Sequence, residues 1–380
     1  MRHCHGHWLF FLIFLISRAG VSAPAWSYFH PIWKDGRPKA DFARLLHDPE
    51  SRLEKEFKVP SRLQSRVLFW SQIYGRFSSA AQILHDRRDP GVTLGVLDFS
   101  PLHAQRMSPF KRDHEIARMR KEIVTEIKRR LIAAWNGRTL AVSTAEEMLD
   151  WRKWLHASGI RTDAQLFLLL ANLRTQSGQR DKFEEALGRS SLLLPEMEKV
   201  FREKGLPVGL ARIPFVESSF NTRAHSKVGA LGIWQFTRRT AKAYIDPKNR
   251  KSWSDPMLQT LAAAKWLKRY RKALPDWGST ITSYNSGTGR VGKMVKQNSV
   301  RDAEQLLHLE DEKQKLGFAG VNFYSEVLAA NLVEAYKTRI FIPGALPEPT
   351  PPVEATFYVP ASAPNPLMAG PSFSPYLRTK

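Results

Sequence analysis

The chain has 380 residues, which at about 150 residues per domain predicts two globular units. Hydrophobic residues make up 43% and charged residues 25%, a composition that excludes disorder over most of the length. Lys and Arg total 58 and Asp and Glu total 36, so the formal net charge is +22. This charge predicts an anionic partner: nucleic acid, an acidic membrane surface or an acidic wall polymer.

The first 25 residues have the layout of a secretory signal peptide. Arg2 precedes an apolar run over residues 8–16, and small residues follow around residues 21–25, so we expect cleavage after Ala25. The run is shorter than the ~20 residues of a spanning helix, so we expect no stable membrane span in the mature protein, with an uncleaved anchor as the alternative. Export predicts a periplasmic protein and argues against nucleic acid as the partner.

Signals for a metal or a cofactor are weak throughout the sequence. Cys4 is the only cysteine and lies in the expected signal peptide, so no disulfide and no cysteine-based metal site is expected. The zinc motif H-E-x-x-H does not occur. Residues 287–292 satisfy G-x-G-x-x-G, but neither a preceding β-branched strand nor a βαβ unit accompanies them. We therefore predict neither a metal nor a cofactor.

Residues 26–200 are predicted to form a mostly helical accessory region. A short strand or hairpin is expected over 92–99, after the turn signal Asp89-Pro90-Gly91. No His, Asp, Glu or Ser cluster with a catalytic spacing occurs in this region. Apolar residues recur at helical spacing in four stretches, over 63–83, 116–135, 145–155 and 164–173.

The composition changes after residue 200. Gly, Ser, Asn and aromatic residues are dense between helical stretches over residues 201–343, which we take as the catalytic domain. Residues 344–380 are rich in Pro and show no apolar period, so we expect a disordered tail.

Glu217 is the strongest candidate for an acid/base group. Leu210, Ile213 and Val216 lie on one predicted helical face, and Pro214 cannot donate a backbone hydrogen bond to the carbonyl of Leu210. The helix is therefore expected to kink or end near Glu217. The apolar neighbours should raise the pKa of this carboxyl group. A carboxylic acid that is protonated near neutral pH can donate a proton to a leaving oxygen.

Three segments in the same region carry a family resemblance. They are Glu-Ser at 217–218, Gly-Ile-Trp-Gln at 232–235 and Ser-Tyr-Asn-Ser-Gly at 283–287. In order and spacing they resemble the SLT domains of lytic transglycosylases (glycoside hydrolase family 23, lysozyme-like superfamily), and the membrane-bound type D subgroup among them. The resemblance covers about residues 205–336. It implies a mainly α protein, with an α+β lysozyme-like catalytic domain after an N-terminal helical accessory domain.

The resemblance also implies roles for individual residues. Glu217 would be the catalytic acid and base, and the hydroxyl of Tyr324 would be directed at it. A single Trp such as Trp234 is more often a core residue than a sugar platform, and that alternative stays open. The substrate-binding residues would be Ser218, Gly232, Ile233, Trp234, Gln235, Phe236, Tyr284, Asn285 and Tyr324.

The implied reaction is cleavage of peptidoglycan glycan strands without water. The β-1,4 bond between N-acetylmuramic acid and N-acetylglucosamine would break, and 1,6-anhydro-N-acetylmuramyl products would form. Only Glu217 lies in the motif cluster, whereas ordinary glycosidases use two carboxylates. Asp255 is interpreted as a helix cap. A hydrolytic muramidase and a non-catalytic peptidoglycan-binding scaffold remain as alternatives, and a nucleic-acid binder is disfavoured by the signal peptide.

Overall fold

The computed structural model describes residues 24–32, 42–245, 255–313 and 316–341. The expected signal peptide, apart from its last two residues, and the expected Pro-rich tail lie outside the described residues. Within the described ranges, no helix combines the length and the apolar character needed to cross a membrane.

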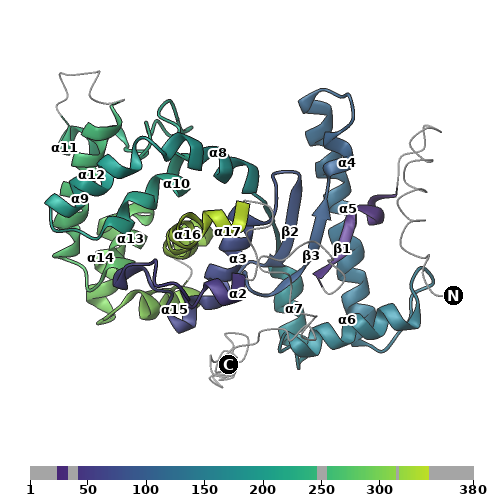
Figure 1. Cartoon of the computed structure of the whole chain (residues 1–380). Coiled ribbons are helices and arrows are strands. Elements are labelled where there is room, and N and C mark those ends of the chain that lie inside the picture. The colour runs from purple at the N-terminus through teal and green to yellow at the C-terminus, as the bar shows by residue number, and fades with distance from the viewer. Residues whose placement is uncertain (1–23, 33–41, 246–254, 314–315, 342–380) are drawn as a thin grey trace, which may run out of the picture.

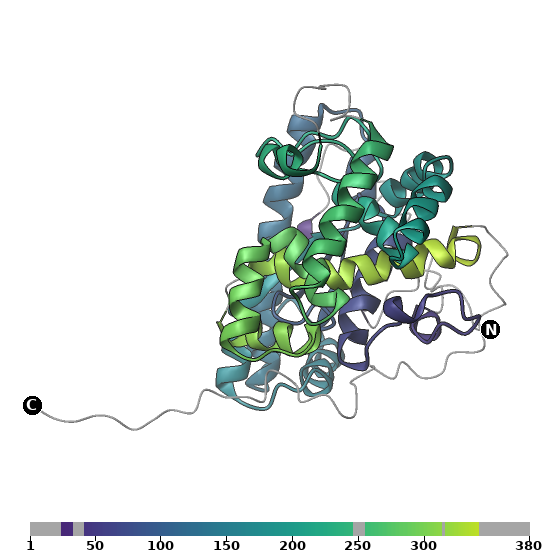
Figure 2. The same ribbon diagram turned by 90° about the vertical axis from the view of Figure 1, so that its left-hand side faces the viewer.

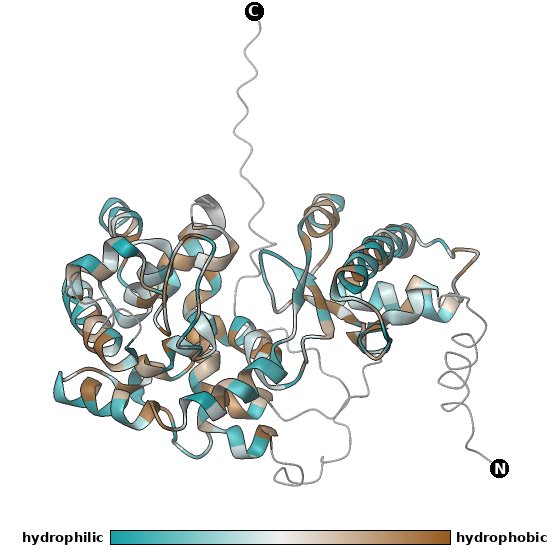
Figure 3. Cartoon of the chain, turned by 90° about the horizontal axis from the view of Figure 1, so that it is seen from above, coloured by the Kyte–Doolittle hydropathy of each residue, from teal (hydrophilic) through white to brown (hydrophobic). Residues whose placement is uncertain are grey.

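The mainly α fold is confirmed, and the chain forms two lobes (Figure 1). The sheet lobe comprises residues 25–32 and 81–177, and the helical lobe comprises residues 42–75 and 180–341. Figure 3 shows that the helices of both lobes carry polar as well as apolar residues, as expected for helices that bury only one face.

The sheet lobe is built on four antiparallel strands in the order β1-β3-β2-β4. The strands are β1 (Phe29–Pro31), β2 (Ala81–Asp86), β3 (Thr93–Asp98) and β4 (Leu173–Ser177). The strand expected over 92–99 is confirmed as β3. The helix expected over 63–83 is wrong in its last part, because β2 is buried along its whole length between β3 and β4.

The sheet lobe also contains the helices α5 (Pro109–Trp135) and α6 (Ala145–Ala157). They confirm the helices predicted over 116–135 and 145–155. Trp151 and Trp154 of α6 are fully buried and meet edge to face, with ring centroids 6.4 Å apart. Arg130 of α5 is also buried, and it forms ion pairs with Glu126 and Glu147. The lobe also contains η1 (Ala25–Tyr28), α4 (Ser100–His103) and α7 (Asp163–Asn172).

The helical lobe surrounds α16 (Gly317–Ala335), which Figure 1 shows nearly end-on. This helix is apolar on nearly every face and is buried along most of its length, as a central helix must be. Its principal neighbours are α3 (Gln64–Gly75), α10 (Ile213–Ser218) and α13 (Trp277–Ser286). The other elements are α2 (Phe42–Leu45), η3 (Lys55–Phe57), η4 (Ser61–Leu63), α8 (Arg180–Ser190), α9 (Leu194–Glu203), η5 (Val208–Arg212), α11 (Arg238–Tyr244), α12 (Pro256–Arg271), α14 (Thr288–Gln297), α15 (Ala303–Lys313) and α17 (Lys337–Phe341).

The core of the helical lobe does not follow the boundary expected near residue 200. It includes Phe57, Trp70 and Tyr74, which come before residues 81–177 in sequence, together with side chains from residue 183 onward. The larger part of the sheet lobe, residues 81–177, is therefore inserted between α3 and α8, while residues 25–32 join the lobe from the N-terminal side. Sequence periodicity alone does not indicate this arrangement, because the two parts of the core are more than 100 residues apart.

Residues 48–57, the N-terminal strap, bind the C-terminal end of α16 (Figure 2). The hydroxyl of Tyr336 donates to Asp48 at 2.7 Å, and burial together with that carboxylate raises its pKa to about 12. Arg52 donates to the carbonyl of Ala335 at 2.8 Å. The ring of Phe57 lies so close to Gly209 that a Cβ there would sit 2.3 Å from it.

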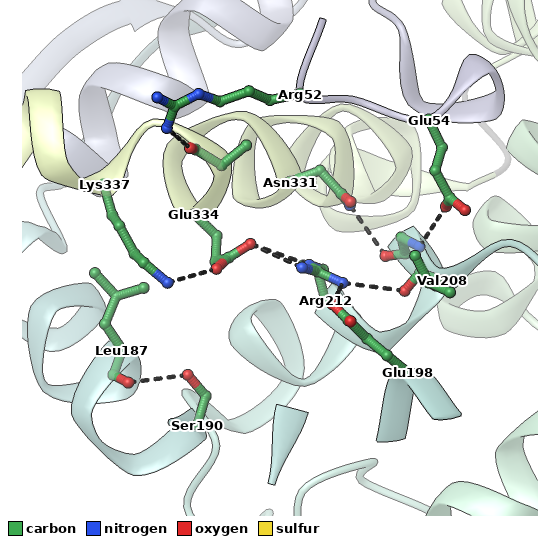
Figure 4. A network of polar contacts seen from close by, with 12 residues as sticks. Arg52, Glu54, Leu187, Ser190, Glu198, Val208, Arg212, Asn331, Glu334 and Lys337 are labelled. Atoms are coloured by element: carbon green, nitrogen blue, oxygen red, sulfur yellow. Dashed lines mark hydrogen bonds and ion pairs between the residues drawn. The ribbon is translucent and has the colours of Figure 1, made fainter. Parts of the chain in front are cut away.

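Charged groups tie the strap region to η5 (Figure 4). Arg212 pairs with Glu198 at 2.5 Å and with Glu334 of α16 at 2.9 Å. Glu54 accepts the backbone N–H of Gly209 at 2.7 Å. An open cavity of about 220 Å³ beside this network is lined by Arg52, Glu54 and Arg212, and Glu217 is not part of its lining.

Candidate active site

Glu217 lies in the last turn of the short helix α10. The expectation that the helix ends near Glu217 is confirmed, but Pro214 stands in the first turn and begins the α-helix after the 3-10 turn of η5. Ser219 and Phe220 then adopt left-handed conformations, with φ of 51° and 56°. The backbone N–H of Phe220 donates to the carbonyl of Pro214 at 3.1 Å.

Two such residues in a row are strained, and packing must hold them in place. Phe220 is fully buried and meets Phe215 edge to face, with ring centroids 4.6 Å apart. This contact stabilises the sharp exit from α10 and keeps Glu217 at the end of the helix.

The Glu217 carboxyl group is half-buried, and burial raises its pKa to about 8. The pKa shift has the direction expected from the apolar neighbours. Within the described ranges no hydrogen bond or ion pair engages this carboxyl group. A group with this pKa is mostly protonated at neutral pH, which is the state that a general acid requires.

A tight loop over residues 224–236 packs beside α10. Gly232 has φ of 70°, and a Cβ there would lie 2.0 Å from the side chain of Gln259, so only glycine fits. Gln235 also has a positive φ, 47°, and its side-chain amide donates to the carbonyls of Ala224 and Gly232. Ser218 donates to the carbonyl of Ile233 at 2.9 Å and so connects the loop to α10.

Trp234 is a core residue and is not available to stack on a sugar. Its exposure is 0%, and its indole N–H donates to the hydroxyl of Thr260 at 3.0 Å. Its backbone N–H donates to Gln259 at 3.3 Å. Of the two roles that the sequence left open for Trp234, its burial supports the core residue and not the sugar platform. Gly232, Ile233 and Phe236 are buried too, so they pack inside the lobe and stabilise the loop.

Tyr284 of α13 lies near Glu217. Its pKa is well above the usual range because the ring is desolvated and, next, because the charge of Glu217 is close. Its hydroxyl donates to the carbonyl of Trp234 at 2.7 Å, and its ring stacks parallel to Phe323 with centroids 6.3 Å apart. The neighbouring Asn285 is exposed at the end of the same helix, where a ligand can reach it.

The structure does not bring Tyr324 to this cluster. Its ring packs against Gly278, where an added Cβ would lie 2.6 Å away. Burial raises its pKa, and the charges that add to this shift belong to Asp276 and Glu304 rather than to Glu217. Successive helix residues point about 100° apart, so Phe323 rather than Tyr324 faces Tyr284. The role expected for Tyr324 is therefore corrected.

Sequence reasoning missed two groups of the same cluster, Glu326 and Tyr74. Glu326 of α16 is half-buried, and burial followed by the charge of Glu217 raises its pKa to about 8. Tyr74 of α3 is buried, and its pKa is raised by burial and by the charge of Glu326. The sequence does contain one signal that could have pointed to Glu326. Glu326 and Glu334 are the only carboxylic acids on the predominantly apolar helix α16.

The described parts of the chain contain no group of three His, Cys, Asp or Glu side chains able to hold a metal ion. The cluster is therefore made of carboxyl and phenol groups, from α10, α16, α13 and α3. Such groups can transfer protons.

Part of this cluster, Glu217 and Tyr284, lies in a segment that matches a known domain, whereas Glu326 and Tyr74 lie outside that segment. Residues 198–307 match the transglycosylase SLT domain. Two curated relatives are similar, both membrane-bound lytic murein transglycosylase D, from Escherichia coli strain K12 and from Escherichia coli O6:H1 strain CFT073. Each is 36% identical over 103 residues, which cover 26% of this chain and 23% of the relative.

A third similar protein is membrane-bound lytic murein transglycosylase F from Stutzerimonas stutzeri strain A1501. It is 30% identical over 142 residues, which are 32% of this chain and 28% of that protein. The chain thus spans less than a third of the length of each of these relatives. The sheet lobe lies outside the residues that match the domain.

Proposed function

We propose that the protein is a peptidoglycan lytic transglycosylase, because residues 198–307 match the transglycosylase SLT domain. Glu217 is its catalytic acid and base. The observation that carries the proposal is the half-buried carboxyl group of Glu217, whose pKa burial raises to about 8, at the end of α10 inside that domain.

The reaction proceeds in two proton transfers at one carboxyl group. Glu217 first donates its proton to the glycosidic oxygen as the C1–O bond of the N-acetylmuramyl unit breaks. Glu217, now a carboxylate, then takes the proton of the C6 hydroxyl as that oxygen bonds to C1. The products are a free 4-hydroxyl group on one strand and a 1,6-anhydro ring on the other, and Glu217 ends in its starting state.

The rest of the cluster suits this chemistry. Tyr284 and the buried loop behind Glu217 hold the carboxyl group in a partly desolvated setting, which favours its protonated form. Ser218 follows Glu217 in the sequence and is half-buried, and Asn285 follows Tyr284 and is exposed. Both side chains can offer hydrogen bonds to a glycan. The net charge of +22 favours association with glycan strands that carry acidic stem peptides. The expected export of the protein to the periplasm would bring it to these strands.

A hydrolytic muramidase is the second candidate, and Glu326 is the observation in its favour. Glycosidases that use water generally have two carboxyl groups at the scissile bond. The sequence motifs contain only Glu217, but Glu326 lies close enough for the two charges to interact. Its raised pKa counts against this candidate, because it leaves Glu326 mostly protonated at neutral pH, and a protonated group cannot activate water as a base.

Product analysis separates the two candidates. Purified sacculi are digested with the protein, and the masses of the released muropeptides are measured. We expect products that are lighter by one water than the hydrolysed forms, and no release by the Glu217→Gln protein. Reducing-end products would assign the muramidase reaction, and co-sedimentation with sacculi without any release would assign a binding scaffold.

A further inference from the structure

Positive charge is concentrated in one part of the helical lobe. Residues 218–298 contain 16 Lys and Arg but only 3 Asp and Glu, so this stretch holds more than half of the net charge of +22. Asp255 and Asp276 are the two of these acids that the structure describes, and both serve as helix caps. Their carboxylates accept the backbone N–H groups of Leu258 and Ser279.

The outer face of α12 exposes four of these cations within two helical turns. Lys265, Lys268, Arg269 and Lys272 are exposed, and spacings of three and four residues place them on one side of the helix. The amine of Lys268 donates to the carbonyl of Lys204 at 2.8 Å, which adds a fifth exposed Lys at the end of α9. Figure 1 shows α9 and α12 on the side of the helical lobe that points away from the sheet lobe. We call these five residues the basic face.

No acid neutralises the basic face. Among the described side chains, none of its five cations forms an ion pair, and α12 contains neither Asp nor Glu. On α5, by contrast, Arg118 pairs with both Glu115 and Glu122. Like charges three and four residues apart destabilise a helix. The helix dipole favours cations only in the last turn, and Lys265 lies before that turn. The stability of α12 therefore does not account for the basic face.

The basic face is separate from the candidate active site. The opposite side of α12 is buried against the loop and helix that carry the site. Gln259 and Thr260 accept hydrogen bonds from Trp234. Trp266 meets Tyr284 edge to face, with ring centroids 4.9 Å apart. A helix about 10 Å across thus stands between the site and the basic face, so a ligand on one leaves the other free.

We infer that the basic face is a second binding surface for peptidoglycan, which binds the carboxylates of stem peptides on strands outside the active site. The inference rests on the proposed function, because that function places the enzyme among such strands. Charge complementarity identifies the occupant, since exposed amines and a guanidinium bind carboxylates and a strand carries many of them. Along α12, which is described throughout, Leu258 is the only large apolar side chain that is exposed, so the helix has little to insert into a bilayer.

Retention on sacculi tests the inference without any cleavage. The parent protein is Glu217→Gln, so that the polymer stays intact. The α12 variant adds three neutralising changes to the parent: Lys265→Gln, Lys268→Gln and Lys272→Gln. The matched control instead adds three on α5, in the sheet lobe: Lys111→Gln, Lys121→Gln and Lys128→Gln. Both variants lose three charges, and Gln keeps a high helix propensity. Each protein is sedimented with untreated sacculi and with sacculi whose carboxylates have been converted to amides.

The α12 variant should be retained roughly tenfold more weakly than the parent on untreated sacculi at low salt, because each exposed ion pair adds only a small factor and three are lost. The control should bind like the parent, and amidation should bring all three proteins to the same weak level. Equal retention of the α12 variant and the parent overturns the inference. So does an equal loss in the control, which would mean that only the net charge matters, or a difference that persists on amidated sacculi.

Vesicles and soluble strands provide two further comparisons. If phosphatidylglycerol vesicles bind the parent but not the α12 variant while sacculi retain both equally, the basic face binds lipid and the inference is wrong. With Glu217 restored, the three α12 changes should leave kcat/KM on peptide-free glycan strands unchanged, and a loss there would place the face in the active site. A protein that cleaves no strand but is still retained through the basic face refutes the proposed function and leaves the inference standing.

A footprint on the parent protein needs no change to the basic face. Acetic anhydride labels exposed amines, and mass spectrometry gives the rate of labelling at each Lys. Untreated sacculi should slow the labelling of Lys265, Lys268 and Lys272 and leave that of Lys121 on α5 unchanged, whereas amidated sacculi should slow none of them. Rates at the three α12 residues that do not respond to untreated sacculi overturn the inference.

Discussion

The hydroxyl of Tyr284 donates a 2.7 Å hydrogen bond to the backbone carbonyl of Trp234. This bond joins α13 to the loop over residues 224–236, which packs beside α10, and two further bonds hold the same loop. Ser218 donates to the carbonyl of Ile233, and the indole of Trp234 donates to Thr260 of α12. The helices α10, α12 and α13 thus hold the backbone of Ile233 and Trp234 beside Glu217. Tyr284 stabilises this loop and also lies near the Glu217 carboxyl group.

Glu217→Gln should abolish most of the activity without loss of fold. General acid/base catalysis contributes typically 10² to 10⁴-fold in rate, and one residue serves both steps here, so a loss at or above the upper end is expected. Muropeptide release and thermal melting measure the two effects. A variant that melts like wild type and still cleaves within about tenfold of its rate contradicts the assignment of Glu217.

The same variant should become relatively more stable as the pH rises. The folded-state pKa of Glu217, about 8, lies above the ordinary value of 4.5, so the stability linked to its proton is complete below pH 4.5 and is lost as the pH rises through 8. Gln does not titrate. The Tm of Glu217→Gln minus that of wild type should therefore grow between pH 4.5 and 8, where 1 kcal/mol corresponds to roughly 2–4 °C. A constant difference would mean that the carboxyl group is not desolvated.

Trp234→Phe should affect stability rather than glycan binding. The ring is fully buried, and the change removes the hydrogen bond to Thr260, which leaves that hydroxyl group without its donor. A cost of about 1–3 kcal/mol in the free energy of unfolding is expected. Calorimetry and co-sedimentation with sacculi check it. Weaker sedimentation at an unchanged Tm would return Trp234 to the role of a sugar platform.

Gly232→Ala should destabilise the loop, whereas Gly289→Ala should not. An added Cβ at Gly232 meets Gln259 at 2.0 Å, at a residue whose φ is 70°. Gly289, near the start of α14, has open space around it and an ordinary φ, and alanine favours a helix by up to about 1 kcal/mol. Denaturant unfolding of both variants is the measurement. Equal midpoints would show that the loop relaxes around the new methyl group.

Phe57→Ala should weaken the helical lobe although Phe57 stands far from the family motifs in sequence. Its side chain is fully buried against Gly209, and loss of a buried Phe costs about 3–5 kcal/mol. The control is Phe110→Ala in the sheet lobe, where the ring is 85% exposed and little change is expected. Melting followed by near-ultraviolet circular dichroism distinguishes them. Similar Tm values would mean that the strap is not part of the folded core.

The position of Glu217 at the end of a short helix could be predicted from the sequence because its signals are local. The apolar neighbours of Glu217 and the following motifs lie within a short stretch, and helical periodicity is also a local property. The strand β2 could not be separated from a helix in this way. Its residues Ala81–Asp86 are buried on both faces, so they show no alternation, and strand pairing with β3 and β4 decides their conformation.

The remaining residues of the site depend on packing between distant segments. Tyr324 and Phe323 differ by one position on α16, and only the orientation of that helix against α13 decides which ring meets Tyr284. Glu326 and Tyr74 are 252 residues apart, and nothing in the local sequence of either indicates that they lie together. Burial of Trp234 follows from the same packing.

The inserted position of the sheet lobe has a consequence for how this chain can be rebuilt. Residues 81–177 begin after α3 and end before α8, and the two ends are hydrogen-bonded neighbours, since Gly178 donates to Ala81 and Gln179 donates to Ile73. A few residues are therefore enough to span the gap if residues 81–177 are excised together with β1, which pairs with β3, and a foreign domain with adjacent termini can take their place. Residues 81–177 can in this sense be exchanged as a module, and the surroundings of Glu217 on α10 should stay as they are.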